Sequence, residues 1–502
     1  MKDLPPDLRR TLLVQLREMG YASSAEQENR DLFSRHFYPV AEHLRVFDPN
    51  VNLIIGYHGT GKSMLFKAAV ERYLSANTAR RLMERDLWLQ TLRPDTSRWL
   101  AGYPWSGGTD FPDPGILRQF ILPIHSQLED IPLQQTIADL WLAYLVRLLD
   151  KNVSLNTTGL DALLSPSGVE VEKICQTVPQ LRVQIIKALD ELDLHLQNEQ
   201  KWIFINYDEL DTLGGIDWEL MALLVRGLLT FWTEHFRRWH RLQVKIFLRK
   251  DLYDNVRIFT ADFSKLAATR IELTWAERNL YAMLIKRMAN LSHEWLEYCR
   301  TAGIDFEKDD HLGWIPQIPR LEAAQPLIQQ IAGQFMGSSI KKGRTFTWIL
   351  GHLRDGHGYI TPRALVGLWG YAAAQELDSQ RASGMQLLHP TSLRRALDDL
   401  SDEYVRMIKD REMPWLEGLT RLLAGKEVPM TRQEWLAILR DNWQSWVNNP
   451  SEKQRPPRPS PEQFLDFLLE LGVCRRRPDD RIDVPDLFLH GLGIKRRGGV
   501  KR

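Results

Sequence analysis

The sequence is poor in cysteine, has almost no net charge, and contains no long uncharged hydrophobic run. Its three cysteines, Cys175, Cys299 and Cys474, lie far apart, which excludes a disulfide framework and a Cys-x-x-Cys metal site. Lysine and arginine number 65 against 64 acidic residues, so bulk charge does not hold this protein on nucleic acid. Because no stretch of about 18 residues lacks charge, we expect neither a transmembrane helix nor a membrane partner. The cysteine usage predicts a location in the reducing cytoplasm.

Strand-like and helix-like segments alternate over the first half of the chain. Short apolar runs over 51–55, 202–207, 244–248 and 271–273 predict β-strands, and helical spacing of apolar residues follows them. This alternation predicts an α/β fold of the P-loop NTPase type, with a mainly parallel sheet covered on both faces.

The 502 residues correspond to about three domains at roughly 150 residues each. We predict an N-terminal helical segment over 1–45, an ATPase domain over 46–275 with a helical insertion at about 80–195, a helical lid over 276–447, a proline-rich linker over 448–461, and a small C-terminal module over 462–502.

The C-terminal module is expected to be winged-helix-like, because a helical pattern over 461–471 precedes a possible β-wing over 473–489. Basic residues concentrate in and near its end: Lys495, Arg496, Arg497, Lys501 and Arg502, with Arg475, Arg476 and Arg477 nearby. Such a basic tail is a candidate contact for nucleic acid or an acidic partner. A solvated, frayed terminus is the alternative.

A glycine-rich loop follows the first predicted strand. It consists of Gly56, Tyr57, His58, Gly59, Thr60, Gly61, Lys62 and Ser63, and fits the Walker A pattern G-x-x-x-x-G-K-[ST] at every fixed position. The glycines allow the backbone N–H groups to turn inward around phosphate, and the following helix adds its positive end. Lys62 carries the counter-charge for the β and γ phosphates, and the Ser63 hydroxyl is a ligand suited to Mg²⁺. ATP and Mg²⁺ are therefore the expected ligands.

The second predicted strand runs into two acids, Asp208 and Glu209, which matches a Walker B pattern. Asp208 is predicted to hold Mg²⁺, and Glu209 to polarise the attacking water as general base. Asp211 completes Asp-Glu-Leu-Asp, and we interpret it as a helix cap because further helicase motifs are absent from the sequence. The sequence also lacks the Asn-Lys-x-Asp motif that reads guanine, which favours ATP over GTP.

Together these segments resemble the AAA+/STAND side of the P-loop ATPases, and more narrowly bacterial KAP-like, defence-associated ATPases. The resemblance rests on the two Walker motifs, on Phe-Leu-Arg-Lys-Asp at 247–251, and on the segments 264–273 and 278–287. It covers roughly residues 40 to 290. It implies ATP hydrolysis coupled to oligomerisation or a conformational switch, beside a separate effector in antiviral defence.

The same resemblance suggests roles for three arginines. Arg249 follows a strand where AAA+ proteins carry the sensor 1 residue, although that residue is usually Asn, Ser or Thr; a salt bridge to Asp251 is the alternative. Arg270 precedes the 271–273 strand and is a candidate arginine finger toward a neighbouring subunit; a surface arginine without such a role is the alternative. Arg363 follows a helix-start signal at Thr361-Pro362 and resembles the sensor 2 arginine.

These expectations describe a Mg²⁺-dependent ATPase that acts as an oligomerising or conformational switch. One alternative is a DNA-stimulated translocase or helicase-like motor, for which the basic tail is the only support in the sequence. The other is a nucleotide-gated scaffold that does not hydrolyse ATP, which the intact Glu209 disfavours.

Overall fold

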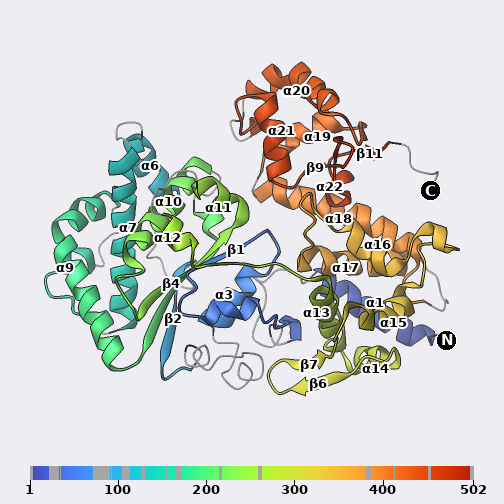
Figure 1. The fold of residues 1–502 in the computed structure, drawn as a ribbon, viewed down its shortest axis with the longest axis horizontal. Helices are drawn as coiled ribbons and strands as arrows, with labels where there is room; N and C mark the ends of the chain where they lie inside the picture. Colours follow the sequence, from blue (N-terminus) through green and yellow to red (C-terminus); the bar gives the residue numbers. More distant parts are fainter. Residues whose placement is uncertain are drawn as a thin grey trace. The chain divides into compact units, whose positions relative to one another are not determined.

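A computed structural model of the 502-residue chain describes residues 4–21, 33, 35–71, 91, 93–104, 114–125, 130–153, 155–164, 171–213, 218–257, 263–379, 386–411, 413–449, 451 and 454–497. The chain forms two compact units (Figure 1). One contains residues 39–273, and the other combines residues 1–38 with residues 274–502.

The unit of residues 39–273 is built on a parallel five-stranded sheet. Its strands are β1 (Leu53–Gly56), β2 (Ser97–Tyr103), β3 (Trp202–Tyr207), β4 (Leu242–Arg249) and β5 (Arg270–Glu272), in the spatial order β2-β3-β4-β1-β5. The predicted strands at β1, β3, β4 and β5 are confirmed. Because β4 lies between β1 and β3, the ends of the phosphate-loop strand and of the acidic strand flank the end of β4.

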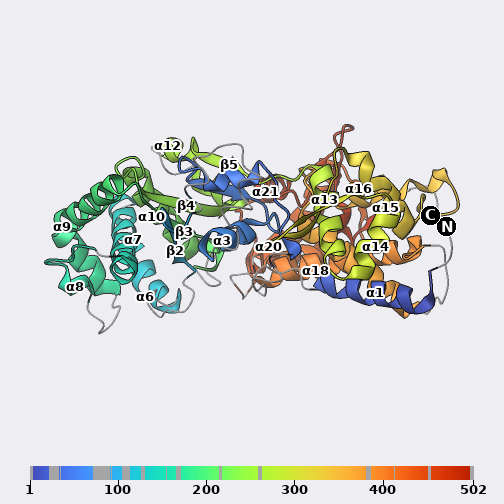
Figure 2. The same cartoon turned by 90° about the horizontal axis from the view of Figure 1, so that it is seen from below.

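Helices cover both faces of this sheet, as expected for a buried parallel sheet. The short helix α3 (Lys62–Val70) packs on one face, and α7 (Asp130–Asn152), α9 (Val171–Asn198) and α10 (Trp218–His235) cover the other (Figures 1 and 2). The remaining elements of this unit are η2 (His43–Phe47), α6 (Pro114–His125), α8 (Asp161–Leu164), η3 (Leu210–Thr212), α11 (Lys250–Arg257) and α12 (Phe263–Ala267). This arrangement is the α/β P-loop NTPase fold.

The edge strand β2 was not expected from the sequence. We predicted a helical insertion over about 80–195, but residues 97–103 pair in parallel with β3 and belong to the sheet. Their sequence, Ser-Arg-Trp-Leu-Ala-Gly-Tyr, is broken by polar and small residues, so it lacks the apolar run of a central strand. The helices predicted over 133–149 and 178–196 are confirmed as α7 and α9. Residues 80–90 and 105–113 of the predicted insertion lie outside the described residues.

The N-terminal helix α1 (Pro6–Tyr21) does not form a segment of its own. It packs against α17 (Pro362–Asp378), and Leu12, Leu13 and Leu16 join the core of the C-terminal unit. Gly20 and Gly370 meet so closely that a Cβ built on Gly20 would lie 2.3 Å from the Cα of Gly370. The predicted 1–45 domain is therefore divided: residues up to 38 join the C-terminal unit, and the rest join the sheet.

The rest of the C-terminal unit is mainly helical. Its elements are α13 (Glu277–Ala289), α14 (His293–Thr301), η4 (Leu321–Ala324), α15 (Gln325–Ala332), η5 (Ile340–Lys342), α16 (Thr345–His352), α18 (Pro390–Arg411), α19 (Leu416–Leu423), α20 (Arg432–Val447), α21 (Pro461–Glu470) and α22 (Asp486–Leu489). The short strands are β6 (Phe306–Asp309), β7 (Gly313–Pro316), β8 (Glu427–Val428), β9 (Arg475–Arg476), β10 (Ile482–Asp483) and β11 (Lys495–Arg496). The antiparallel hairpin of β6 and β7 interrupts the predicted helical lid.

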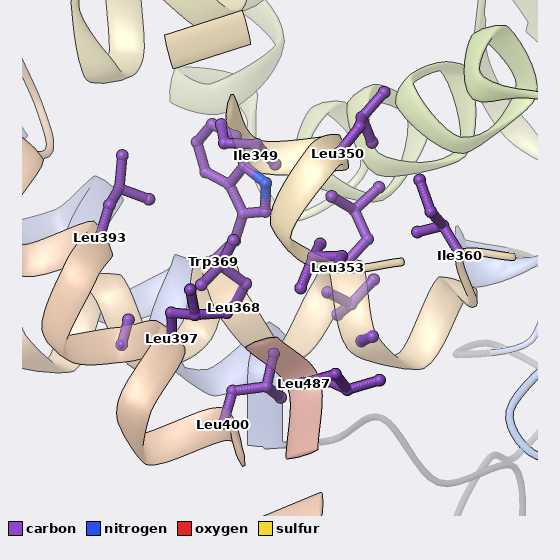
Figure 3. Packing of buried hydrophobic residues seen from close by; sticks show 14 of the residues in the cluster. Ile349, Leu350, Leu353, Ile360, Leu368, Trp369, Leu393, Leu397, Leu400 and Leu487 are labelled. Atoms are coloured by element: carbon purple, nitrogen blue, oxygen red, sulfur yellow. The ribbon is translucent and has the colours of Figure 1, made fainter. Parts of the chain in front are cut away.

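A single hydrophobic cluster runs through this unit. Figure 3 shows its packing around Ile349 and Leu350 of α16, Leu353 directly after that helix, Leu368 and Trp369 of α17, Leu393, Leu397 and Leu400 of α18, and Leu487 of α22. The core is therefore continuous from the helical lid into the predicted C-terminal module.

The predicted proline-rich linker over 448–461 does not separate two modules. It joins α20 to α21, and these helices pack on each other through Trp446 and Phe464, whose ring centroids lie 5.0 Å apart. The wing-like hairpin is present, since β9 and β10 pair antiparallel. Proline and charge marked the loop in the sequence, but nothing local revealed that its flanking helices share a core.

Most of the described basic tail belongs to the fold. The strand β11 pairs in parallel with β8, and Leu492 and Ile494 just before it are buried. Arg496 bonds to Asp483 and Asp486, and Arg497 bonds to Glu434. The alternative of a frayed terminus therefore does not hold for residues 491–497. Lys501 and Arg502 lie outside the described residues.

The composition led us to expect no disulfide framework and no transmembrane helix. All three cysteines are unpaired. Within the described ranges, no helix combines the length and the apolar character needed to cross a bilayer.

Candidate functional site: the phosphate loop and the acidic strand end

The phosphate loop leaves the sheet at Gly56 and enters α3 at Lys62. Two of its residues need backbone angles that favour glycine: Gly59 has φ 76° and Gly61, which precedes the first turn of α3, has φ 100°. The Thr60 hydroxyl donates to the carbonyl of Tyr57 at 2.8 Å and closes the turn. A Cβ on Gly56 would lie 2.5 Å from Thr60 Oγ1, so this turn also requires glycine at Gly56. The loop and helix thus take the shape of a phosphate cradle at a helix N-terminus.

Lys62 bends back over its own loop. Its Nζ donates to the carbonyls of Gly56 at 2.9 Å and Tyr57 at 3.0 Å. Removal from water lowers the pKa of the Lys62 ammonium, and the nearby charge of Asp208 partly opposes that shift. Two neutral carbonyls are weaker partners for an ammonium than an anion would be. Lys62 is therefore held beside the cradle, ready to exchange these carbonyls for phosphate oxygens.

Asp208 follows β3 and lies close to the phosphate loop. Its side chain is almost wholly buried, accepts a hydrogen bond from the Ser63 hydroxyl, and is electrostatically coupled to Lys62. Burial raises the pKa of the Asp208 carboxyl, while the bond from Ser63 and the charge of Lys62 oppose the rise. Its second oxygen, Oδ2, has no hydrogen-bond partner. A buried carboxylate oxygen without a partner is costly unless something else binds it.

That oxygen provides a test of the predicted metal site. Mg²⁺ prefers hard oxygen ligands and usually takes only one or two from the protein, with phosphate and water completing its shell. The free oxygen of Asp208 and the hydroxyl of Ser63 meet this requirement. In the part of the chain that the structure describes, no cluster of three or more His, Cys, Asp or Glu residues could hold a metal by itself. The donor set therefore fits Mg²⁺ bound together with a nucleotide.

Glu209 adopts a left-handed backbone conformation, with φ 51° and ψ 31°. Such angles are uncommon for a residue other than glycine, and they cluster at functional sites. The carbonyl of Glu209 accepts from the backbone N–H of Thr212 at 2.9 Å and from its hydroxyl at 2.8 Å, which holds the turn. The chain therefore turns sharply after β3 and sets the half-buried Glu209 beside the buried Asp208.

Arg249 ends β4 and is paired in register with Gly56. It is 7% exposed, and it donates to Asp251 from Nε at 3.1 Å and from Nη2 at 2.8 Å. Its Nη1 donates to Asp211 at 3.2 Å. The predicted bridge to Asp251 is therefore present, while Asp211 binds Arg249 and is not a helix cap. All three charges also influence the pKa of Lys62, which places them near the phosphate loop.

The other two arginines lie elsewhere. Arg270 is exposed at the amino end of β5, in register with Leu53, so it is at the opposite edge of the sheet from Gly56. Its Nη1 donates to the carbonyl of Ala267 at 2.9 Å. Arg363 belongs to the C-terminal unit, at the start of α17, where its Nη1 contacts the sulfur of Met407 at 3.5 Å. The structure brings together Lys62, Ser63, Asp208 and Arg249, with Glu209 directly after Asp208. Arg270 begins β5 at the amino edge of the same sheet, and Arg363 belongs to the other unit.

Sequence reasoning missed two features of this site. Asp211 and Arg249 are 38 residues apart, and neither shows a local pattern that points to the other. Tyr103, which ends β2, bonds through its hydroxyl to Thr212 at 2.6 Å and so ties the edge strand to the turn after Glu209. Only the recognition of β2 as a strand could have indicated this contact.

No protein-family model and no curated protein matches the chain. Solved structures similar to it include the ORC2 protein of Aeropyrum pernix in ADPNP and ADP complexes, with TM-score 0.29 and 14% identity over 88% of this chain and 86% of that chain. Cdc6p from Pyrobaculum aerophilum has TM-score 0.27 and 11% identity over 88% and 86% of the two chains. The Walker-type ATPase PABY2304 of Pyrococcus abyssi has TM-score 0.34 and 13% identity over 90% and 94%. These similarities are remote, and the fold assignment rests on the sheet and the phosphate loop.

Proposed function

We propose that this chain binds ATP with Mg²⁺ at the carboxyl edge of its sheet and hydrolyses it. The observation that carries the proposal is the meeting of Lys62, Ser63 and the unpartnered oxygen of Asp208 beside a phosphate cradle. A cation and the phosphates of a nucleotide would satisfy all three groups at once.

Each residue has a defined task in this proposal. The N–H groups of the loop and the ammonium of Lys62 bind the phosphates, and Glu209 accepts a proton from the attacking water. Ser63 and Asp208 would hold Mg²⁺, which supplies charge neutralisation at the phosphates when bound. Arg249, at the end of the strand between the two Walker segments, stabilises the charge that develops on the γ-phosphate.

A test of this function is Mg²⁺-dependent phosphate release by the purified full-length chain. Lys62→Ala should abolish ATP binding, because it removes the counter-charge of the phosphates. Lys187→Ala is the matched control, since Lys187 is 76% exposed on α9 and pairs with Glu191 on the same helix. Phosphate release that persists in Lys62→Ala, or that continues in excess EDTA, would argue against the assignment.

We further propose that hydrolysis is completed between copies of the chain. Arg270 is exposed at the edge of the sheet opposite its own phosphate loop, which is where an arginine must lie if it serves a neighbour's site. Arg270→Ala should bind ATP normally and hydrolyse it poorly, and mixing with Lys62→Ala protein should restore activity. A monomer with full activity, or mixtures that stay inactive, would count against assembly.

We propose, from the resemblance alone, that the chain is a switch in bacterial antiviral defence and acts on a separate effector. Arg363 as a sensor 2 residue belongs to the same proposal. Size measurement with and without ATP, combined with mass identification of co-purifying chains, tests the oligomer and the effector together.

A further inference from the structure

A second concentration of basic and aromatic groups lies in the C-terminal unit, whereas the phosphate loop belongs to the unit of residues 39–273. It is a groove of about 390 Å³ between α16 and the elements β9, α22 and β11. Arg344 immediately precedes α16, Trp348 and His352 come from that helix, and Arg475 and Arg496 come from the two short strands. Three guanidinium groups from separate parts of the sequence therefore line one depression.

Two carboxylates, the buried Asp483 and the partly buried Asp486, hold two of these arginines in place. Asp483, whose side chain is 1% exposed, accepts from Arg475 Nη2 at 2.9 Å and also bonds to Arg496. Asp486 accepts from Arg496 Nη2 at 2.8 Å and lies 2.6 Å from Nδ1 of His352. The acids restrict the guanidinium groups to fixed orientations. Nε, Nη1 and Nη2 of Arg496 all donate to Asp483, Asp486 or the Val484 carbonyl, so this residue contributes mainly positive charge. Arg475 donates to Asp483 from Nε and Nη2, which leaves its Nη1 to reach a phosphate oxygen.

The charge in the groove is not fully neutralised. Two carboxylates balance Arg475 and Arg496, but Arg344 is exposed, and none of the described acids bonds to it. The groove therefore keeps about one uncompensated positive charge, close to two further guanidinium groups. An anion could therefore bind Arg344 without breaking an ion pair within the described residues.

The groove also offers an aromatic surface. Trp348 is half-buried and packs against the imidazole of His352, with ring centroids 4.4 Å apart. Next to them, a Cβ built on Gly351 meets no atom within 4 Å, which shows open space above α16. A partly exposed tryptophan beside a cluster of arginines is the arrangement that stacks a base while its phosphate is bound.

We propose that this groove binds a nucleoside phosphate, with the phosphate on Arg344 and Arg475 beside the charge of Arg496, and the base on Trp348. Its volume lies within the roughly 300–1,000 Å³ typical of small-ligand sites. The nucleoside phosphate is either a free nucleotide or an unpaired nucleotide of a single strand, because both present the same two groups. This site is independent of the proposed ATPase, since all of its residues belong to the unit of residues 274–502.

The test uses the full chain carrying Lys62→Ala, so that nucleotide binding at the phosphate loop does not contribute. Fluorescence anisotropy is measured with two probes, N-methylanthraniloyl-AMP and fluorescein-labelled hexathymidylate, and hexaglutamate serves as a competitor. Further substitutions are Arg344→Ala, Trp348→Ala and Gly351→Leu. Lys341→Ala is the matched control, because Lys341 is an exposed cation three residues before Arg344. Near-UV circular dichroism confirms that each variant is folded.

Binding should weaken about tenfold or more in Arg344→Ala and in Trp348→Ala. Gly351→Leu should weaken it comparably by filling the groove without changing a charge, whereas Lys341→Ala should stay within about twofold. If both probes bind, a free nucleotide is sufficient to occupy the groove. If only hexathymidylate binds, the ligand is a nucleotide within a single strand. Three results would overturn the proposal. The first is that neither probe binds, and the second is that the variants bind the probes as well as Lys341→Ala does. The third is that hexaglutamate displaces the probes equally well from wild type and from Trp348→Ala, which would mean that Trp348 does not contact the base.

Discussion

Buried charged groups are bonded differently at the two ends of the parallel strands, which we call the amino edge and the carboxyl edge of the sheet. At the amino edge, Asp193 of α9 accepts from the backbone N–H groups of His240, Arg241 and Leu242 at 3.0, 2.6 and 2.8 Å. Lys245 there donates to the carbonyls of Asp48 and Val51, each at 2.5 Å. Every one of these bonds is made to the backbone of the fold itself. Asp193 therefore holds the start of β4, and Lys245 holds the segment that leads into β1.

At the carboxyl edge a buried acid is not fully satisfied. Asp208 has a buried oxygen without a hydrogen-bond partner, and Glu209 directly after it has left-handed backbone angles. These features cost stability, and they are located where a nucleotide and a cation would compensate them. The comparison teaches that buried charge is not by itself a sign of function. What separates the two edges is whether the protein satisfies its own charges.

The largest expected effect comes from Asp208→Asn. Removing the carboxylate should lower kcat by about 10³-fold, because the cation loses its protein anion. Since the change also removes a buried charge with an unpartnered oxygen, the thermal midpoint should stay the same or rise. Phosphate release and thermal unfolding measured on one preparation check this. A variant that loses stability while keeping its activity would place Asp208 with the structural charges of the amino edge.

The opposite pattern is expected for Asp193→Ala. It leaves three backbone N–H groups without an acceptor, so the free energy of unfolding should fall by about 3 kcal/mol. ATP affinity of the folded protein should be unchanged. Glu191→Ala, at an exposed acid on the same helix that pairs with Lys187, is the control and should cost no more than about 1 kcal/mol. Equal losses in the two variants would show that the buried bonds of Asp193 are not special.

A pH effect distinguishes Lys245. Burial lowers the pKa of this lysine from 10.5 to about 7, with Asp48 partly opposing the shift. Between those pH values the unfolded chain binds a proton that the native state lacks, so the contribution of Lys245 to stability rises with pH. The free energy of unfolding of wild type relative to Lys245→Met should increase by about 2 kcal/mol from pH 7 to pH 9. Urea unfolding at both pH values measures it, and a difference independent of pH would refute the shift.

The smallest effect concerns the two acids that hold Arg249. Asp251→Asn should lower kcat about tenfold with little change in KM, because the guanidinium loses its orientation and not its charge. Asp251→Glu should restore part of the rate. Asp254→Asn, an exposed acid on the same helix, provides the control. If KM rises while kcat is unchanged, Arg249 contributes to binding and not to the transition state.

The sequence was informative where a pattern is local. Mainly apolar runs marked β3 and β4, and the spacing of glycines, lysine and serine marked the phosphate loop. It was uninformative where the deciding contact is distant. The edge strand β2 carries Arg98 and Gly102 and has no apolar run, and the partner of α1 lies some 350 residues away in α17.

The candidate site, too, could be predicted only where its residues follow a local pattern. Residues 208 and 209 could be predicted because they directly follow a strand, but the roles of Asp211 and Asp193 depend on contacts with β4. Lys245 was part of a run predicted as a strand, and nothing in that run showed that its ammonium would be bound by two carbonyls before β1. Polar residues inside apolar strands are therefore the positions where structure adds most.

The central claim is that the carboxyl edge is a hydrolytic ATP site, and Glu209→Gln tests it most directly. The measurement is a single-turnover experiment with excess protein and γ-labelled ATP, in which bound ATP and released phosphate are quantified together. The expected result is normal binding with hydrolysis slowed by roughly 10²-fold or more, the scale of a lost general base. Hydrolysis at the wild-type rate in Glu209→Gln, or no ATP binding by the wild type, would contradict the claim.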